Sequence, residues 1–441
     1  MDVSNNNKNT KYTRIKKYIV IMAGGSGTRM RSDVPKQLMN VGNVPMMVHL
    51  LNNAVYMQTP VILVVSTKNK DIILKILLDG RYIHRTQDQD RYICKSSTCG
   101  YDDIDVWINV QPIANGTGGA ILATSEFLRL VDPNDSVLVL SADVPLITKK
   151  TMNLMFDKIS NSQSHCCILA KDTVSNFGYG RVCMDDNGGF IKIVEQKDCS
   201  DEEKNITLIN NGVYTFKIGS LLSVLPLLEP NNAQNEYYLT DCAKLIRDVM
   251  SKVPYPVKVH VMDNNQRYDE TLGANTPEQL EDLRNEYIKK FSVESIDGSD
   301  INMSDYNLQN LIKILDQLSS SKSNHMNLDK IRLHIETMNE SKINKKHLMV
   351  IKYEDIVVGT GSVLIEDKLI HCMGKVGHIE DVVVDEMYRN LGLAKMLMIQ
   401  LIEFAKDAGC YKVILDASDT VEGFYKKLGF HRHANNMRLD F

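Results

Sequence analysis

Short runs of apolar and β-branched residues alternate with longer amphipathic stretches from Lys17 onward. Such runs are typical of buried strands, and strands separated by helices predict a mostly parallel sheet with helices on both faces. The first half of the chain is therefore predicted to be an α/β domain that binds ligands at the carboxyl ends of its strands. The predicted strands are YIVIMA (18–23), VILVVS (61–66), DVWINV (105–110), SVLVLSADVPL (136–146), HCCILA (165–170) and FIKIVE (190–195).

A polar stretch without periodicity, SVESIDGSDINMSDYN (292–307), separates this pattern from a second one. We interpret the stretch as a junction, because polar segments that lack a helix or strand period are typically loops. A helix that starts at Thr276 and Pro277 precedes it, with a good N-cap followed by proline at the first helical position. The predicted parts are a disordered leader at 1–16 and domains at 17–290 and 291–441; no hexapeptide repeat indicates a β-helix.

The second domain is predicted to place one long helix among several strands. Four apolar side chains recur on one face of that helix, which makes them first of all a core stripe: Leu393, Leu397, Leu401 and Phe404. A helix near 308–318 and a serine-rich loop, SSSKSN (319–324), come earlier. The predicted strands are HLMVIKY (347–353), DIVVGTGSVLIE (355–366), HIEDVVV (378–384) and YKVILDAS (411–418).

Composition narrows the class of protein. A formal net charge of -4 gives no electrostatic reason to expect nucleic acid or a membrane surface as a partner. The nine cysteines have neither zinc-site nor disulfide-framework spacing, which favours reduced thiols. The apolar run before the first glycines is too short for a signal peptide or a membrane span. These features predict a cytoplasmic enzyme or binding protein.

A glycine-rich loop follows the first strand in IMAGGSGTRMRSDVPKQL (21–38). The dinucleotide fingerprint fails because its third glycine position is Met30, and the P-loop fails because no lysine follows the glycines at the required distance. What is left is a loop whose backbone can approach phosphates, followed by Arg29 and, seven residues later, Lys36. Two cations at this spacing can bracket a triphosphate and neutralise a leaving pyrophosphate.

These motifs, MAGGSGTRM followed by DVPKQL, resemble those of nucleotidyltransferases that make nucleotide sugars. Further segments resemble the bacterial-type N-acetylglucosamine-1-phosphate uridylyltransferases, in the family's order and over roughly residues 17–285: QPIANGTGGAI, SADVPLI, FGYGRV, VEQKDCSDEE, INNGVY, NNAQNEYYLTD and TLGANTPEQL. The resemblance implies a Rossmann-like nucleotidyltransferase domain that uses UTP and Mg²⁺. It also implies that the sugar phosphate attacks the α-phosphorus in line, so that pyrophosphate leaves without a covalent intermediate.

The resemblance implies a role for each matching position. Arg29 and Lys36 would be catalytic groups on the phosphates, and Asp143 and Asn275 would hold Mg²⁺, a hard cation suited to oxygen ligands. Gln111, with Gly116 and Thr117, would read the uracil edge. The nucleotide would contact Met22, Ala23, Gly24, Gly25, Gly27, Thr28, Gln111, Gly116, Thr117 and Ala142, and the N-acetylglucosamine would contact Gly180, Glu195 and Asn210. Taken singly, Asp143, Glu195 and Asn275 are equally compatible with turn or surface residues.

A second glycine loop lies between a strand and a helix, with Arg389, Gly392 and Ala394 in the pattern R-x-x-G-x-A. A helix start of this kind binds anions through its unpaired N–H groups. The segments TGSVLIEDKLIHCMGKVGHIEDVVV, YRNLGLAKML, CYKVILDAS and GFYKKLGF resemble glucosamine-6-phosphate N-acetyltransferases of the GNAT superfamily, closely from about 345 to 430. The resemblance implies an α+β GNAT domain that uses acetyl-CoA and forms a homodimer.

Residue roles in this domain also come from the resemblance. Tyr425 would protonate the departing thiolate as a general acid, with Glu380 and Asp416 also catalytic. Acetyl-CoA would contact Val382, Val383, Val384, Arg389, Asn390, Leu391, Gly392, Leu393, Ala394, Lys395 and Tyr425, and the amino-sugar phosphate would contact Lys368, His371, Glu380, Asp381, Asp416 and Arg438. We interpret His378 as a core or turn histidine.

Two positions depart from the acetyltransferase pattern. Val421 stands where the family has a coenzyme-contacting asparagine, and Asp440 stands where the family has a basic residue for the sugar phosphate of the partner subunit. Arg438, two residues earlier on the same strand face, is the predicted substitute. In the first domain Gly24 follows Ala23, where the bacterial enzymes that the domain resembles often have a second alanine. This small change leaves the predicted site intact.

Together the two halves predict a bifunctional enzyme of UDP-N-acetylglucosamine synthesis. One alternative is the same folds acting on another amino sugar or nucleotide. The other is a degenerate second domain that only binds or regulates, which the departures at Val421 and Asp440 would allow. Small-molecule substrates, rather than nucleic acid or membrane, are the expected partners.

Overall fold

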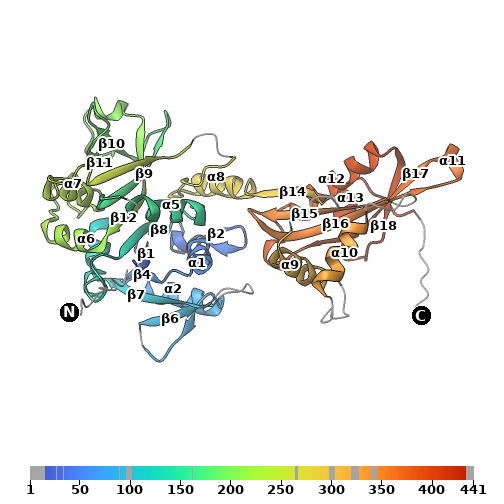
Figure 1. Cartoon of the computed structure of the whole chain (residues 1–441), viewed down its shortest axis with the longest axis horizontal. Helices are drawn as coiled ribbons and strands as arrows, with labels where there is room; N and C mark the ends of the chain where they lie inside the picture. Colours follow the sequence, from blue (N-terminus) through green and yellow to red (C-terminus); the bar gives the residue numbers. More distant parts are fainter. Residues whose placement is uncertain are drawn as a thin grey trace, which may run out of the picture. The chain divides into compact units, whose positions relative to one another are not determined.

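The computed structural model describes residues 15–25, 27–32, 34–88, 90–95, 102–160, 162–263, 267–296, 303–318, 327–338 and 345–433. The chain divides between Glu286 and Tyr287 into two compact units (Figure 1). The predicted leader lies outside the described residues except for Ile15 and Lys16. The serine-rich loop at 319–324, Arg438 and Asp440 also lie outside them.

The first unit is built on a mixed sheet with a parallel centre. Strands β4 and β8 lie on either side of β1, β7 lies beyond β4, and β12 joins β8 in antiparallel orientation. The predicted α/β architecture is confirmed, and no β-helix is seen in the described residues. The strands of this sheet are β1 (Lys17–Met22), β4 (Val61–Ser66), β5 (His84–Arg85), β6 (Arg91–Cys94), β7 (Ile104–Gln111), β8 (Ser136–Ser141), β9 (Cys166–Asp172), β10 (Gly180–Met184), β11 (Phe190–Val194), β12 (Leu208–Lys217) and β13 (Val257–Val261).

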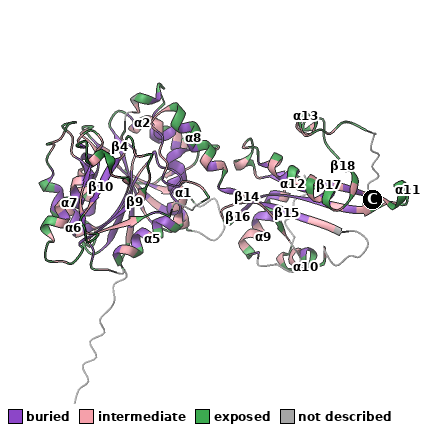
Figure 2. Cartoon of the chain, turned by 90° about the horizontal axis from the view of Figure 1, so that it is seen from above, coloured by how far each residue is buried: buried purple, intermediate pink, exposed green. Residues whose placement is uncertain are grey.

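Helices cover both faces of this sheet because alternate residues of its strands face in opposite directions. In β1, Ile19 and Ile21 belong to one hydrophobic core and Val20 to the other, and Figure 2 shows the strands as largely buried. The first core is closed by α1 (Met46–Tyr56), α2 (Lys70–Asp79) and α5 (Lys149–Ser160). The second is closed by α3 (Thr117–Leu122), α4 (Ser125–Leu128), α6 (Ile218–Val224) and α7 (Leu239–Val249).

The second unit carries an antiparallel sheet in the order β14-β15-β16-β17, to which β18 adds in parallel. Leu308 and Leu311 of α9 pack with Val350 on one face, whereas Leu397 and Leu401 of α12 lie beside Gly361 on the other (Figure 1). Its elements are β14 (Phe291–Ile296), α9 (Asp305–Leu315), α10 (Leu328–Met338), β15 (Lys345–Tyr353), β16 (Ile356–Asp367), α11 (Ile370–Met373), β17 (Lys375–Val384), α12 (Leu393–Asp407), β18 (Cys410–Leu415) and α13 (Glu422–Lys427).

Two predicted segments are corrected. The strand predicted over 136–146 ends at Ser141, because the N–H of Val144 donates to the Ser141 carbonyl and turns the chain. The stretch 292–307, predicted to be a junction loop, contains most of strand β14 at its start and the first residues of α9 at its end. Strand β14 lies at the edge of its sheet with partly exposed side chains, so its sequence lacks the apolar run that marks a central strand.

No helix in the described part of the chain combines the length and the apolarity needed to cross a bilayer.

Candidate active sites

The first candidate site lies where the strand order of the parallel sheet reverses. Strands β4 and β8 lie on opposite sides of β1. Open α/β sheets bind ligands at such a point, where the strand order changes direction. The N–H of Ala23 donates to Val64 O at 2.7 Å, and the N–H of Ala142 donates to Met22 O at 3.1 Å. The glycine loop after β1 and the Ala142–Asp143 turn after β8 are therefore neighbours, as the predicted nucleotide site requires.

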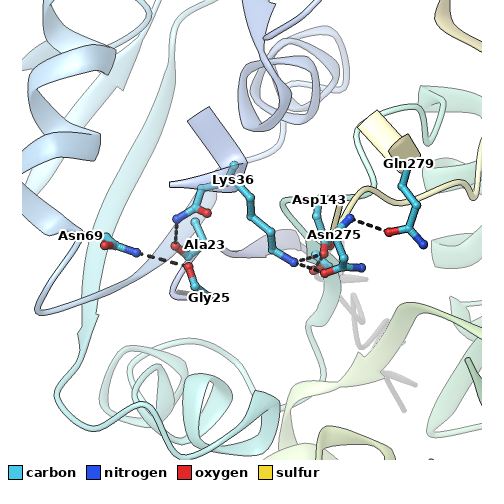
Figure 3. Close-up of polar contacts among 9 residues, drawn as sticks. Ala23, Gly25, Lys36, Asn69, Asp143, Asn275 and Gln279 are labelled. Carbon is cyan, nitrogen blue, oxygen red and sulfur yellow. Dashed lines mark hydrogen bonds and ion pairs between the residues drawn. The ribbon is translucent and has the colours of Figure 1, made fainter. Parts of the chain in front are cut away.

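Lys36 connects this loop to both residues predicted to hold the metal. Its Nζ donates to Asp143 Oδ2 and, at 2.6 Å, to Asn275 Oδ1 (Figure 3). The stem of Lys36 runs along the glycine loop: a Cβ added at Gly27 would lie 3.2 Å from Lys36 Cβ, and Gly27 has a φ of +59°. Glycine is thus required at position 27 both by the backbone conformation and by the close approach of Lys36.

The carboxyl group of Asp143 is held in its charged form. Burial alone would oppose ionisation, but the Lys36 ammonium and the Ser141 hydroxyl both donate to this carboxylate and together lower its pKa. The site therefore holds a buried negative charge directly beside a positive charge. This pair suits a ligand that brings phosphates together with a cation.

Asp143 and Asn275 fit a hard divalent cation. Their oxygens converge on a single cationic nitrogen, that of Lys36, so the geometry already accommodates positive charge at this point. Mg²⁺ commonly takes one or two protein oxygens and completes its shell with water and substrate phosphates. Within the described residues no group of three or more His, Cys, Asp or Glu side chains could hold a metal ion.

Arg29 is not drawn into this cluster. It lies exposed in the 3-10 turn Thr28–Met30, and among the described residues no hydrogen bond or ion pair joins it to Lys36, Asp143 or Asn275. Two backbone contacts steady the loop itself: Gln37 Nε2 donates to Ala23 O at 2.6 Å, and Asn69 Nδ2 donates to Gly25 O at 3.3 Å.

The predicted uracil-reading residues form a compact group at the end of β7. Gln111 is buried, and its Nε2 donates to Asn115 Oδ1 at 3.0 Å and to Gly116 O at 3.1 Å. A Cβ added at Gly24 would lie 3.0 Å from Gln111 Oε1, so the glycine loop and the Gln111 amide are in direct contact. The side chain is therefore fixed in orientation before any base binds.

Sequence reasoning gave no role to the segment around Tyr237, which fastens this loop. The Tyr237 backbone exchanges hydrogen bonds with it: its N–H donates to Asn115 O at 2.8 Å, and its carbonyl accepts from Gly118 N–H at 2.7 Å. A Cβ added at Gly116 would lie 2.5 Å from that carbonyl, and Gly116 has a φ of +100°. The hydroxyl of the next tyrosine, Tyr238, donates to Asp198 Oδ2 at 3.2 Å, and Asp198 follows the predicted sugar residue Glu195 in the chain. The segment of Tyr237 and Tyr238 therefore contacts both the Gly116 loop and the chain just after Glu195.

The three predicted sugar-binding residues lie together. Gly180 of β10 is the register partner of Asn210 of β12, and a Cβ added at Gly180 would lie 3.4 Å from Glu195 Oε2. Asn210 Nδ2 donates to Tyr214 OH at 2.6 Å. Burial raises the pKa of Glu195, and the nearby carboxylates of Asp198 and Asp241 add to that rise. The result is a small acceptor-rich surface bordered by a glycine.

The second candidate site opens where β17 and β18 separate. Their pairing ends at Ile379 and Leu415, although β17 continues to Val384. Opposite β16, Asp381 and Val382 stand against the single residue Gly361, because Thr360 pairs with Val383 and Ser362 with Glu380. Asp381 accordingly has a φ of +56°, a strained value for a non-glycine residue. This bulge includes Val382, which is predicted to contact acetyl-CoA.

The second glycine loop starts helix α12. Gly392 is its N-cap, with a φ of +79°, and Asn390 also has a positive φ of +63°. Arg389 Nε donates to Val384 O at 3.0 Å, and its guanidinium donates to Gln317 Oε1 at 2.7 Å. These bonds fix the loop against the end of β17, so the N–H groups at the start of a fifteen-residue helix stand beside the bulged strand.

Tyr425 lies half-buried on α13, with its ring against Phe424 and Phe430. Burial raises the pKa of its hydroxyl. A phenol with a raised pKa keeps its proton through neutral and mildly alkaline pH, as a general acid must. Val421, one of the two departures from the family pattern, is the N-cap of the same short helix.

The predicted amino-sugar phosphate residues fall into separate groups. Glu380 and Asp381 share one cation, since Lys346 Nζ lies 3.6 Å from Glu380 Oε2 and 3.3 Å from Asp381 Oδ2. Lys368 instead pairs with Glu366, whose other oxygen lies 2.8 Å from a ring nitrogen of His378.

His371 and Asp416 belong to neither group. The His371 ring lies against Tyr411 at an interplanar angle of 43° in a left-handed turn, and Asp416 is exposed just after β18. Sequence reasoning missed Lys346 of β15 and Glu366 of β16, whose charges were the only signal in the sequence.

Comparison with known families follows the same division. Residues 18–258 match the nucleotidyl transferase family, and residues 315–430 match the acetyltransferase (GNAT) family. Because the first match spans more than half of the chain, the chain belongs to the nucleotidyl transferase family, and a GNAT domain follows the nucleotidyltransferase domain.

Individual relatives narrow the likeness. The chain is 32% identical over 259 residues to the bifunctional protein GlmU of Lactococcus lactis subsp. lactis (strain IL1403). The matched region covers 59% of this chain and 49% of that protein. The chain thus spans about half the length of such relatives. It is 30% identical over 266 residues to the probable UDP-N-acetylglucosamine pyrophosphorylase of Acanthamoeba polyphaga mimivirus, covering 60% of this chain and 94% of that protein.

Among solved structures, the chain is similar to the crystal structure of glucosamine-6-phosphate N-acetyltransferase from Arabidopsis thaliana, with 31% sequence identity, 34% of this chain and 98% of that chain covered, and a TM-score of 0.30.

Proposed function

We propose that the first domain transfers the uridylyl group of UTP to N-acetylglucosamine 1-phosphate and releases pyrophosphate. The observation that carries this proposal is the convergence of Lys36, Asp143 and Asn275 at the switch point of a nucleotidyltransferase sheet. Likeness to a protein named as a probable UDP-N-acetylglucosamine pyrophosphorylase, over 94% of that protein, supports the choice of nucleotide and sugar.

In this proposal the chemistry is an in-line displacement at phosphorus. A phosphate oxygen of the sugar phosphate forms a bond to the α-phosphorus, the bond from that phosphorus to the bridging oxygen breaks, and pyrophosphate leaves with the electron pair. Lys36 and Arg29 neutralise the charge on the phosphates. Mg²⁺ held by Asp143 and Asn275 would supply further charge neutralisation on the phosphate oxygens.

The recognition roles follow from the contacts around the cluster. Gln111 presents a pre-oriented amide to the edge of the base, because its own hydrogen bonds to Asn115 and Gly116 hold it in place. Glu195 and Asn210 accept or donate hydrogen bonds at the sugar, and Gly180 leaves room for it. Positioning therefore accounts for much of the proposed catalysis.

We propose that the second domain transfers an acetyl group from acetyl-CoA to the amine of glucosamine 6-phosphate. The amine nitrogen bonds to the thioester carbonyl carbon, the carbon–sulfur bond breaks, and Tyr425 gives its proton to the departing thiolate. The nitrogen loses one proton to solvent as the amide forms, and the Tyr425 phenolate takes a proton back from solvent. The bulge at Asp381 and Val382 supports a place for the thioester, and the Gly392 loop supports a place for the coenzyme pyrophosphate.

Three further points belong to this proposal. The boundaries 17–290 and 291–441 are proposed as the functional domains, and the protein is proposed to be cytoplasmic. A homodimer through the second domain is supported by an exposed apolar turn that contains Leu369, Ile370 and Met373. Because one domain acts on a 6-phosphate and the other on a 1-phosphate, a separate mutase must act between them, which rules out direct channelling.

The test supplies purified protein with UTP, Mg²⁺ and N-acetylglucosamine 1-phosphate while pyrophosphate is followed, with ATP, CTP and glucosamine 1-phosphate as competing choices. A second assay follows free thiol from acetyl-CoA with glucosamine 6-phosphate or the 1-phosphate. Pyrophosphate release only with another nucleotide or sugar would replace the proposed substrates. Thiol release only with the 1-phosphate would reverse the order of steps, and no thiol release with either would indicate a degenerate second domain.

A further inference from the structure

A buried carboxylate outside the predicted site joins the two segments that carry Asp143 and Asn275. Glu270 is only 3% exposed. Its Oε2 accepts from the Thr148 N–H at 2.8 Å, and its Oε1 accepts from the Thr151 hydroxyl at 2.7 Å. Thr148 ends the turn that begins with Asp143, and Glu270 begins the loop that ends with Asn275, so the contact spans both segments.

The two segments are also fastened at their other ends. The N–H of Ala274 donates to Asp143 O at 3.1 Å, and a Cβ added at Gly273 would lie 3.2 Å from Val144 Cγ2. The segments 143–148 and 270–275 are therefore in contact at both of their ends. The side chains of Asp143 and Asn275 leave from one end of this pair, and Glu270 closes the other end.

Capping of helix α5 does not explain Glu270 by itself. The Thr148 hydroxyl already accepts from the Thr151 N–H at 3.1 Å, which is the usual N-cap bond of a threonine. Glu270 takes instead the Thr148 N–H, which lies before the helix, and a side-chain hydroxyl. A buried carboxylate is costly unless it is hydrogen-bonded, and here both oxygens have partners near a helix start that favours negative charge.

We infer that Glu270 is a positioning residue for nucleotidyl transfer: it fixes the loop of Asn275 against the turn of Asp143 and so sets the spacing of their two oxygens. This inference rests on the proposed function of the first domain. Partners that orient metal-binding or phosphate-binding side chains in this way commonly change metal affinity or activity about 10- to 100-fold when removed.

The experiment measures cation binding without turnover. Mn²⁺ is titrated calorimetrically into the full chain saturated with UTP, with no sugar phosphate present, for the wild type, Glu270→Ala, Glu270→Gln and Thr151→Val. We expect Glu270→Ala to weaken Mn²⁺ binding about tenfold, Glu270→Gln to recover most of the affinity because one acceptor oxygen remains, and Thr151→Val to lie between them. Thr151→Val keeps the shape of the side chain, so it tests the inference even if Glu270→Ala does not fold.

Asp135→Asn is the matched control. Asp135 is also a buried acid, 4% exposed, and accepts from the Lys16 N–H at 2.7 Å, but it precedes β8 whereas Asp143 follows that strand. It should lower the unfolding temperature without changing Mn²⁺ affinity. Equal loss of Mn²⁺ affinity in Asp135→Asn, or unchanged affinity in both Glu270→Ala and Thr151→Val, would overturn the inference.

Kinetics supply an independent readout, with UTP binding and the thermal unfolding of the first domain in the same sample as the measures of folding. The account expects Glu270→Ala to lower kcat for pyrophosphate release about tenfold and to leave the KM for sugar phosphate within about twofold. A rise in that KM with unchanged kcat would contradict a role at the phosphates. Failure of the proposed function is distinguishable, because then the wild type itself releases no pyrophosphate.

Discussion

Lys36 Nζ donates to Asn275 Oδ1 at 2.6 Å although the two residues lie 239 positions apart in the chain. The same nitrogen donates to Asp143, so three distant segments meet at one charged point. The lysine is 16% exposed at its side chain, which leaves it within reach of a ligand.

Replacing Lys36 by Met should therefore remove nucleotidyl transfer and spare acetyl transfer. Loss of a cation aimed at the phosphates is expected to lower kcat/KM for pyrophosphate release about 1,000-fold. Lys192→Met, which breaks the ion pair of Lys192 with Glu203 on the surface, is the control and should leave both activities unchanged. Loss of both activities in Lys36→Met would show that the domains are not independent.

Gly116→Ala should weaken UTP binding. The added Cβ would lie 2.5 Å from the Tyr237 carbonyl, so the Gly116 loop must move away from Tyr237. Because Gln111 donates to the Gly116 carbonyl, its side chain would move with the loop. We expect the KM for UTP to rise about tenfold, or about 1.4 kcal/mol. Gly188→Ala is the matched control, since Gly188 has a φ of +75° but nothing within 4 Å; it should lower stability by about 1 kcal/mol and leave that KM unchanged.

Glu195→Gln should stabilise the protein while impairing sugar binding. Burial raises the pKa of this carboxyl, so the charged form is less favourable in the folded state than in the unfolded state. That cost is present above the raised folded pKa and vanishes below the unfolded pKa. At pH 7 the neutral glutamine removes it, and thermal unfolding should show a higher midpoint, with a KM for sugar phosphate raised about tenfold. A lower midpoint at pH 7 would contradict the role of burial.

Tyr425→Phe should lower kcat for acetyl transfer about 100-fold, the usual contribution of a general acid. Because burial raises the pKa of the Tyr425 hydroxyl above 10.0, the proton is lost only above that value. The wild type should thus show no decline in kcat from this group between pH 7 and its ordinary pKa of 10.0. A decline that sets in near pH 8 and is absent from Tyr425→Phe would show that the phenol titrates much lower than its burial implies.

The sequence predicted the central strands because β1, β4 and β8 are buried on both faces and read as continuous apolar runs. It did not predict β10, which is short and begins with Gly180 and Arg181, or β12, whose alternation is interrupted by polar residues and by the irregular register between Asn210 and Tyr214. Edge strand β14 was not predicted for a related reason: its half-exposed side chains are largely polar, so its sequence resembles a polar junction.

The candidate site was predictable where a motif lies on one loop, as with the glycines before Lys36. Family likeness suggested that Asp143 and Asn275 lie together, but their shared contact with Lys36 was not predicted, because nothing in their spacing encodes it. Glu270 was passed over although it lies five positions from Asn275, since a buried acid and a surface acid read alike in sequence. Such contacts depend on how loops pack after the sheet has formed, which local patterns do not specify.

The central claim is that the first domain makes UDP-N-acetylglucosamine at the Lys36, Asp143 and Asn275 cluster. Phosphorus NMR of full-length protein with UTP, Mg²⁺ and N-acetylglucosamine 1-phosphate tests it most directly, with Lys36→Met in parallel. The account predicts that signals of a nucleotide diphosphate sugar and pyrophosphate grow together with the wild type and stay absent with Lys36→Met. Unchanged substrate signals with the wild type, or equal product formation by the variant, would contradict it.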